Sequence, residues 1–140
     1  MKIRNVTIIP ASKPSQPDRY LGTPGKSHVV GYARVIKGIG AGVQIRKNIR
    51  RLIADRQDWE LTFVTTDHCK TKDQKSTWRS FLSICHGIEC RYIDILIIHS
   101  ANDLESAVAI ARDLLPLCKS NGVAEYVAHN DRLLTESEFK

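Results

Sequence analysis

The chain has 140 residues and a net charge of +6, with 42% hydrophobic and 26% charged residues. This length allows one domain with a substantial core and is too short for two. No apolar run approaches the ~20 residues that a membrane helix needs, which excludes a membrane span and makes the cytoplasm the expected compartment.

Basic residues are concentrated in the first part of the chain. Residues 1–60 hold 12 Lys and Arg against 4 Asp and Glu, whereas residues 61–140 hold 9 against 11. A basic front half suggests a polyanionic partner, most plausibly nucleic acid. A solvated basic surface is an equally good interpretation of the charge alone.

The first 27 residues are expected to form an extended N-terminal arm. Pro10, Pro14, Pro17 and Pro24 argue against a helix or a central strand there. A short edge strand fits residues 3–9.

Strand and helix patterns alternate over residues 28–130, the predicted α/β domain. Strands are predicted at residues 29–35, 59–66, 93–98 and 123–128, and helices at 43–56, 78–87 and 102–121. Asn102 is expected to cap the third helix, with Glu105 in the capping-box position. Residues 131–140 are expected to form a polar tail. This order predicts an α/β three-layer sandwich with a mainly parallel sheet of about four to five strands.

The segment at residues 31–38, Gly-Tyr-Ala-Arg-Val-Ile-Lys-Gly, is the most informative string. It reads as a short apolar strand that runs into a glycine-rich turn. In many α/β proteins a reactive side chain or a phosphate site lies at the C-terminal end of such a strand.

This segment resembles the first strand of the catalytic domain of serine site-specific recombinases, in the large serine recombinase branch. The family pattern is Tyr, a small residue, Arg, Val and then the nucleophilic Ser. Three further strings resemble the family in the same order: residues 8–14, 58–61 and 92–97. The likeness spans roughly residues 3–130. It implies a resolvase-like fold of mobile-element origin, associated with DNA recombination.

The resemblance also implies a degenerate active site around Tyr32, Arg34 and Ile36. Ile36 stands at the nucleophile position, and an aliphatic side chain has no oxygen to attack a phosphodiester. Family arginines that stabilise the transition state correspond to Trp78, Asp103 and Ser106. We therefore expect a pseudoenzyme that does not cleave DNA strands.

Weak, salt-sensitive DNA binding is the expected residual activity, with an intact recombinase as a second possible partner. The candidate phosphate contacts are Arg34, Lys37, Arg46, Lys47, Arg50 and Arg51. The resemblance further implies a long dimerisation helix after the fourth strand. The sequence does not contain this helix, so the resemblance leaves the oligomeric state open. The 140 residues are either a naturally short protein or part of a longer one. No cofactor and no metal are expected.

Other interpretations of the same sequence stay open. The turn from Gly38 to Gly42 suggests a small-molecule or nucleotide-binding module, although its spacing misses the dinucleotide pattern. A decayed remnant without function is a third hypothesis. His99 and Ser100 follow the third strand, but adjacent residues of an extended segment point to opposite faces, which argues against a catalytic pair.

The cysteines and histidines offer a loose zinc pattern. Cys85, His86 and Cys90 form a Cys-His-x3-Cys cluster. Zinc sites usually combine two short Cys/His hooks, so buried free thiols are the favoured interpretation.

Overall fold

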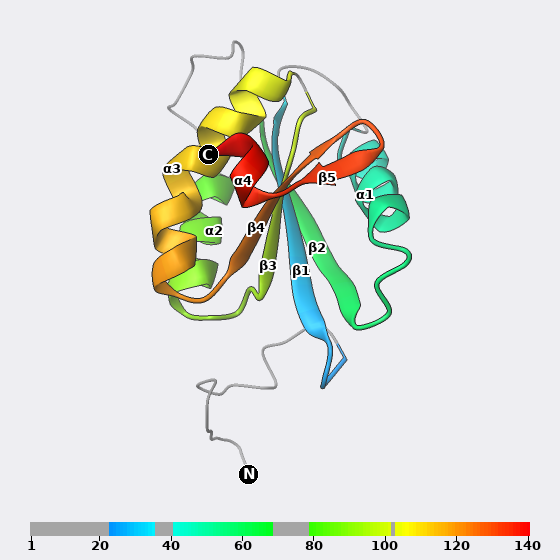
Figure 1. Cartoon of the computed structure of the whole chain (residues 1–140), viewed down its shortest axis with the longest axis vertical. Coiled ribbons are helices and arrows are strands. Elements are labelled where there is room, and N and C mark those ends of the chain that lie inside the picture. The colour runs from blue at the N-terminus through cyan, green and yellow to red at the C-terminus, as the bar shows by residue number, and fades with distance from the viewer. Residues whose placement is uncertain (1–22, 36–40, 69–78, 102) are drawn as a thin grey trace.

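The computed structural model describes residues 23–35, 41–68, 79–101 and 103–140 and shows an α/β three-layer sandwich, as predicted (Figure 1). Its strands are β1 (Ser27–Val35), β2 (Trp59–His68), β3 (Ile95–His99), β4 (Ala124–His129) and β5 (Arg132–Leu134). Its helices are α1 (Ala41–Leu52), α2 (Arg79–Glu89), α3 (Leu104–Ser120) and α4 (Glu136–Phe139). The sheet order is β2-β1-β3-β4-β5, parallel except for β5.

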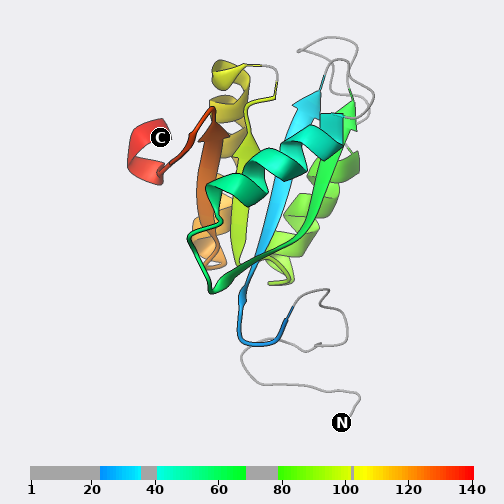
Figure 2. The same ribbon diagram turned by 90° about the vertical axis from the view of Figure 1, so that its right-hand side faces the viewer.

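Two apolar layers hold the sheet between its helices. Helices α2 and α3 cover one face and α1 crosses the other (Figures 1 and 2). In β1 the side chains alternate, so that Val30 and Tyr32 face α2 and α3 while Val29 and Ala33 face α1. Strand β3 is apolar and buried over four successive residues, as expected for a parallel strand covered on both sides.

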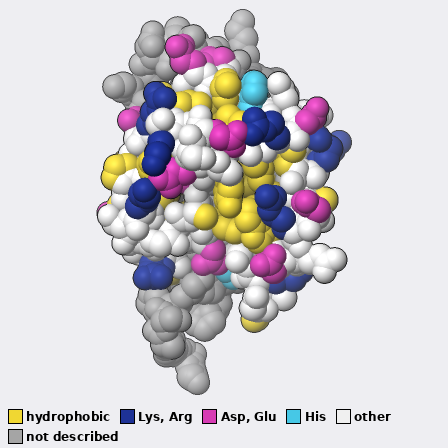
Figure 3. Space-filling model, in the orientation of Figure 1, with side chains coloured by type: hydrophobic (Ala, Val, Ile, Leu, Met, Phe, Trp, Pro, Cys, Tyr) yellow, Lys and Arg dark blue, Asp and Glu magenta, His cyan; other side chains and the backbone are white. Residues whose placement is uncertain are grey.

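The α1 face is covered unevenly. Helix α1 packs mainly over β1 and β2. Towards β4, the ring of Trp59 reaches across the sheet to Tyr126, with 5.5 Å between ring centroids. Leu133 packs on the same cluster. Figure 3 views the β4–β5 side, where hydrophobic side chains gather between α3 and α1. Large side chains therefore replace a helix on this half of the face.

The strand order creates a topological switch point. From β1 the chain goes to the edge strand β2 and then returns to β3 on the other side of β1. In open α/β sheets, the crevice outside the carboxyl ends of two such strands is the usual ligand site. The ends of β1 and β3 therefore define where a functional site is expected.

The predicted polar tail is a folded unit. Residues 131–140 contain β5, which pairs antiparallel with β4, and α4. Phe139 is 1% exposed, and the side chain of Arg112 donates from Nε to the Phe139 carbonyl at 2.8 Å. A capping box between Thr135 and Glu138 begins α4. The Thr-x-x-Glu spacing is a signal in the sequence for this helix start.

Element boundaries shift by a few residues from the predictions. Helix α1 ends at Leu52 instead of residue 56, and α2 continues past Gly87 to Glu89. A Cβ atom at Gly87 would lie 2.9 Å from Cδ1 of Ile93, so this glycine serves close packing and does not end the helix. The strand expected at residues 3–9 lies outside the described ranges. Among the described helices, none has the length and apolarity to cross a membrane.

Candidate functional site

The carboxyl ends of β1 and β2 bring Tyr32, Arg34 and Asp67 together. Tyr32 and Arg34 point to the α2 side, where the Tyr32 hydroxyl donates to Asp67 Oδ2 at 2.6 Å. The Arg34 Nε donates to the Tyr32 hydroxyl oxygen at 3.1 Å. The Arg34 guanidinium carbon lies 4.9 Å from the ring centre of Phe81. A hydrogen bond to Tyr32 and cation–π contacts with the rings of Tyr32 and Phe81 therefore help to hold Arg34.

Asp67 anchors this cluster to the beginning of α2. Its Oδ1 accepts from the Ser80 backbone N–H and its Oδ2 from the Phe81 backbone N–H, each at 2.8 Å. A carboxylate in this position satisfies N–H groups that have no partner within the helix and favours the positive end of its dipole. Asp67 is 3% exposed. Its place at the end of a strand is the signal in the sequence that points to it.

The hydroxyl groups of this cluster have structural partners. Burial, followed by the hydrogen bond to Asp67, raises the pKa of Tyr32 far above its ordinary value, against the opposing effect of Arg34. The Ser80 hydroxyl donates to the Thr66 carbonyl at 2.9 Å and accepts from the Thr65 hydroxyl at 2.7 Å. The raised pKa keeps the Tyr32 hydroxyl protonated, and the Ser80 hydroxyl donates to a carbonyl oxygen, which is not a base, so neither arrangement activates an oxygen as a nucleophile.

Two positions that the resemblance assigns to arginines form a helix cap instead. Asp103, and not Asn102 as predicted, is the N-cap of α3, and its Oδ1 accepts from the Ser106 backbone N–H at 2.7 Å. The Ser106 hydroxyl also donates to Asp103 Oδ2 at 3.1 Å. Asn102 itself falls outside the described ranges, as do Ile36, Lys37, Trp78 and residues 38–40 of the glycine-rich turn. Gly42 lies within α1.

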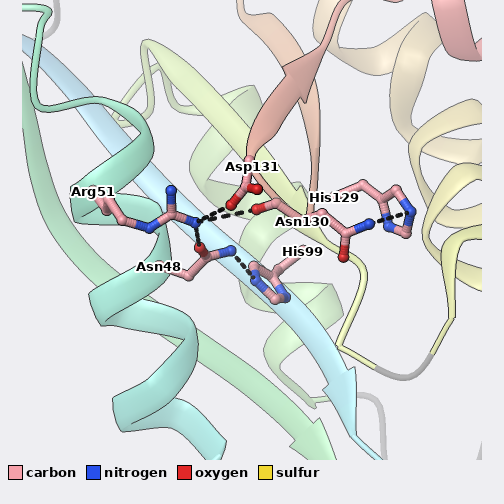
Figure 4. A network of polar contacts seen from close by, with 6 residues as sticks. All are labelled: Asn48, Arg51, His99, His129, Asn130 and Asp131. Carbon is pink, nitrogen blue, oxygen red and sulfur yellow. Dashed lines mark hydrogen bonds and ion pairs between the residues drawn. The ribbon is translucent and has the colours of Figure 1, made fainter.

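A second polar cluster lies at the ends of β3 and β4, on the α1 side (Figure 4). Arg51 donates to the side-chain carbonyl of Asn48 and to the Asn130 backbone carbonyl, and forms an ion pair with Asp131 at 3.2 Å. Asn48 Nδ2 lies 2.9 Å from Nε2 of His99. The network joins α1 to the turn between β4 and β5.

This network fixes the tautomer of the neutral His99 ring. An arginine offers only donors, so Asn48 must turn its carbonyl to Arg51 and its amide nitrogen to His99. His99 Nε2 is then the acceptor, and the proton of the neutral ring sits on Nδ1. That atom is buried without a hydrogen-bond partner in the described ranges. Burial, and secondarily His129, lowers the pKa of His99.

Ser100 contacts a different histidine from its neighbour. Its hydroxyl lies 3.0 Å from Nδ1 of His129, whose Nε2 is 3.2 Å from the Asn130 side-chain nitrogen. With Asn130 donating, His129 accepts at Nε2 and donates from Nδ1 to Ser100. In this arrangement the His129 imidazole donates to Ser100 and does not accept its proton.

The predicted phosphate contacts do not form one surface. Arg34 lies on the α2 side of the sheet, whereas the four cations of α1 lie on the opposite side. Lys47 and Arg50 are exposed, Arg46 is half-buried, and Arg51 is engaged with Asp131. One straight polyanion can therefore contact either Arg34 or the cations of α1.

The cysteines of the described ranges are free thiols. Cys118 is buried, and burial raises its pKa to about 12. Cys85 and Cys90 are half-buried, and Cys90 Sγ lies 3.5 Å from His86 Nε2. Within those ranges no three His, Cys, Asp or Glu side chains are grouped as metal ligands would be.

Neither a scan against protein-family models nor a search of curated proteins finds a match to this chain.

Proposed function

We propose that the chain is a recombinase-like domain of mobile-element origin that associates with DNA and does not cleave it. The ordered resemblance over roughly residues 3–130 supports the ancestry. The three-layer sandwich is the architecture that the resemblance implies, and it is shared with many α/β proteins.

The observation that carries the proposal is the cap formed by Asp103 and Ser106. Both positions would hold arginines in an active recombinase, and here their side chains are committed to the first turn of α3. A carboxylate at this place repels the phosphate that an arginine would attract. Together with Ile36 at the nucleophile position, this supports a site that has lost strand cleavage.

Arg34 supports the DNA association. It lies at the carboxyl end of β1, beside the switch point, and its guanidinium is oriented by Tyr32 and Phe81. A guanidinium presents its N–H donors in a planar fork that matches the geometry of a phosphate group. A pre-oriented arginine at this edge is suited to a single phosphate contact of modest strength.

Fluorescence anisotropy with labelled duplex DNA tests the association. We expect weak binding that declines steeply between low and high salt, because phosphate contacts release counterions. Arg34→Gln should weaken binding about tenfold, the loss expected for one charged hydrogen bond. Lys119→Gln, an exposed cation at the far end of α3, is the matched control. Binding that is indifferent to salt would contradict the proposal.

A search for covalent adducts tests the loss of cleavage. The protein is incubated with candidate recombination-site DNA and separated on a denaturing gel. We expect no covalent protein–DNA species. An adduct that disappears with a single substitution such as Ser100→Ala would show a working nucleophile and overturn the inactive interpretation.

A further inference from the structure

An open pocket of about 400 Å³ lies at the amino edge of the sheet, at the end opposite to Arg34. It is formed where α1 ends and β2 begins. The side chains important for the argument are Lys26, Arg50, Arg56, Trp59 and Glu60. Its volume lies in the range of pockets that hold small organic ligands.

The charge of this pocket favours an anion. Three cations line it against one carboxylate. Lys26 and Arg50 make no ion pair within the described part of the chain. The Glu60 carboxylate accepts the backbone N–H of Thr23, and this hydrogen bond is the main cause that lowers the pKa of Glu60. Glu60 is therefore ionised at neutral pH, and its charge also interacts with that of Lys26. The three cations still leave the pocket with an excess of two positive charges.

The pocket lies beside the C-terminal end of α1, so an anion there must be bound by side chains. The C-terminal end of a helix carries a partial negative charge, so its backbone does not attract phosphate. Of the two arginines in the last turn, Arg51 is directed to Asp131, and Arg50 lines the pocket. An anion here depends on side chains alone, and its affinity is expected to be salt-sensitive.

A cation–π pair forms one wall. The Arg56 guanidinium carbon lies 4.5 Å from the ring centre of Trp59, and the Trp59 ring is in turn packed against Tyr126. Nucleobases stack on aromatic rings and on guanidinium planes without strong preference for one base. The pocket thus combines a stacking wall with two cations beside it.

We propose that this pocket binds a nucleotide, with its phosphate between Lys26 and Arg50 and its base against the Arg56–Trp59 pair. Two sources have this chemistry, a free mononucleotide and one unit of single-stranded DNA. The site goes beyond the proposed function, since it uses neither Arg34 nor the carboxyl edge of the sheet.

Tryptophan fluorescence tests the proposal directly. The chain has two tryptophans, so Trp78→Phe leaves Trp59 as the only reporter. AMP and the oligonucleotide dT10 should each change its emission at low salt. Arg50→Gln should weaken binding about tenfold. Arg79→Gln, an exposed cation at the beginning of α2 and outside the pocket, is the control. Stronger binding of dT10 assigns the site to single strands, and stronger binding of AMP assigns it to free nucleotides.

Three results would overturn the proposal. They are no response to millimolar AMP or dT10, an equal loss of affinity in Arg79→Gln, and inorganic phosphate binding as tightly as AMP, which would show an adventitious ion only. If Trp78→Phe does not fold, the same titration is followed by NMR in the unsubstituted chain. The indole N–H signal of Trp59 is then the reporter, and Trp59→Phe assigns it. Arg34→Gln should leave AMP binding unchanged, which separates this site from the proposed DNA contact.

Discussion

Two acidic side chains, Asp67 and Glu125, are buried to nearly the same degree but differ in their hydrogen bonds. Asp67 is 3% exposed and Glu125 is 6% exposed. Asp67 accepts hydrogen bonds from Tyr32, Ser80 and Phe81. Both carboxyl oxygens of Glu125 are buried without a partner in the described ranges. Burial alone therefore does not say whether a carboxyl group stabilises this fold.

The difference follows from where each residue lies. Asp67 stands at the end of β2, where the first N–H groups of α2 point at it. Glu125 is inside β4, on the side of α3 and α4, among apolar side chains. Burial, and secondarily the charge of Glu136, raises the pKa of Glu125 to about 8. At neutral pH Glu125 is largely protonated, which avoids a buried charge.

The largest effect is expected from Asp67→Ala. The substitution leaves two backbone N–H groups of α2 and the Tyr32 hydroxyl without their acceptor, and Arg34 loses the fixed position of its partner. We expect a loss of about 3 kcal/mol in the free energy of unfolding. Urea unfolding followed by circular dichroism measures it.

The control for this variant is Asp113→Ala, at an exposed position of α3. It should change stability by less than about 0.5 kcal/mol. Similar losses in the two variants would mean that the hydrogen bonds of Asp67 do not stabilise the fold.

A slope of stability against pH is the next largest expected effect, and it comes from Glu125. Its pKa rises from an ordinary 4.5 to about 8 on folding, so the folded state binds more protons between these values. The free energy of unfolding should fall as pH rises through this window, by at most about 1.4 kcal/mol per pH unit. Glu125→Gln should remove most of this slope, as urea unfolding between pH 5 and pH 9 would reveal.

Glu89→Gln, an exposed glutamate at the end of α2, provides the comparison. It should keep the slope of the unsubstituted chain. If Glu125→Gln retains the full slope as well, the slope does not come from Glu125.

The sequence predicts the layers of this fold well and its polar contacts poorly. The apolar run of β3 and the helical spacing of Ile45 and Ile49 report burial, which is a property of each segment. The bond from Tyr32 to Asp67 joins residues 35 positions apart and depends on which strands are neighbours. The link from Asn48 to His99 likewise follows from the strand order. Arg50 and Arg51 are adjacent in the sequence, yet only the folded chain separates a pocket cation from a paired one.

The smallest expected effect concerns His99, and its sign is opposite to that of Glu125. Burial lowers the pKa of His99 below its ordinary 6.5, so the unfolded state binds more protons as the pH falls. This contribution to stability is complete above pH 6.5 and declines as the pH falls below it. Protonation at Nε2 would also place an N–H donor opposite the N–H donor of the Asn48 amide, whose orientation Arg51 fixes. His99→Gln should flatten the acid side of the stability profile between pH 5 and pH 6.5, while His86→Gln, on the exposed face of α2, should not. A folded-state His99 that titrates by NMR at or above its ordinary pKa would show that the Arg51–Asn48–His99 chain does not control the ring.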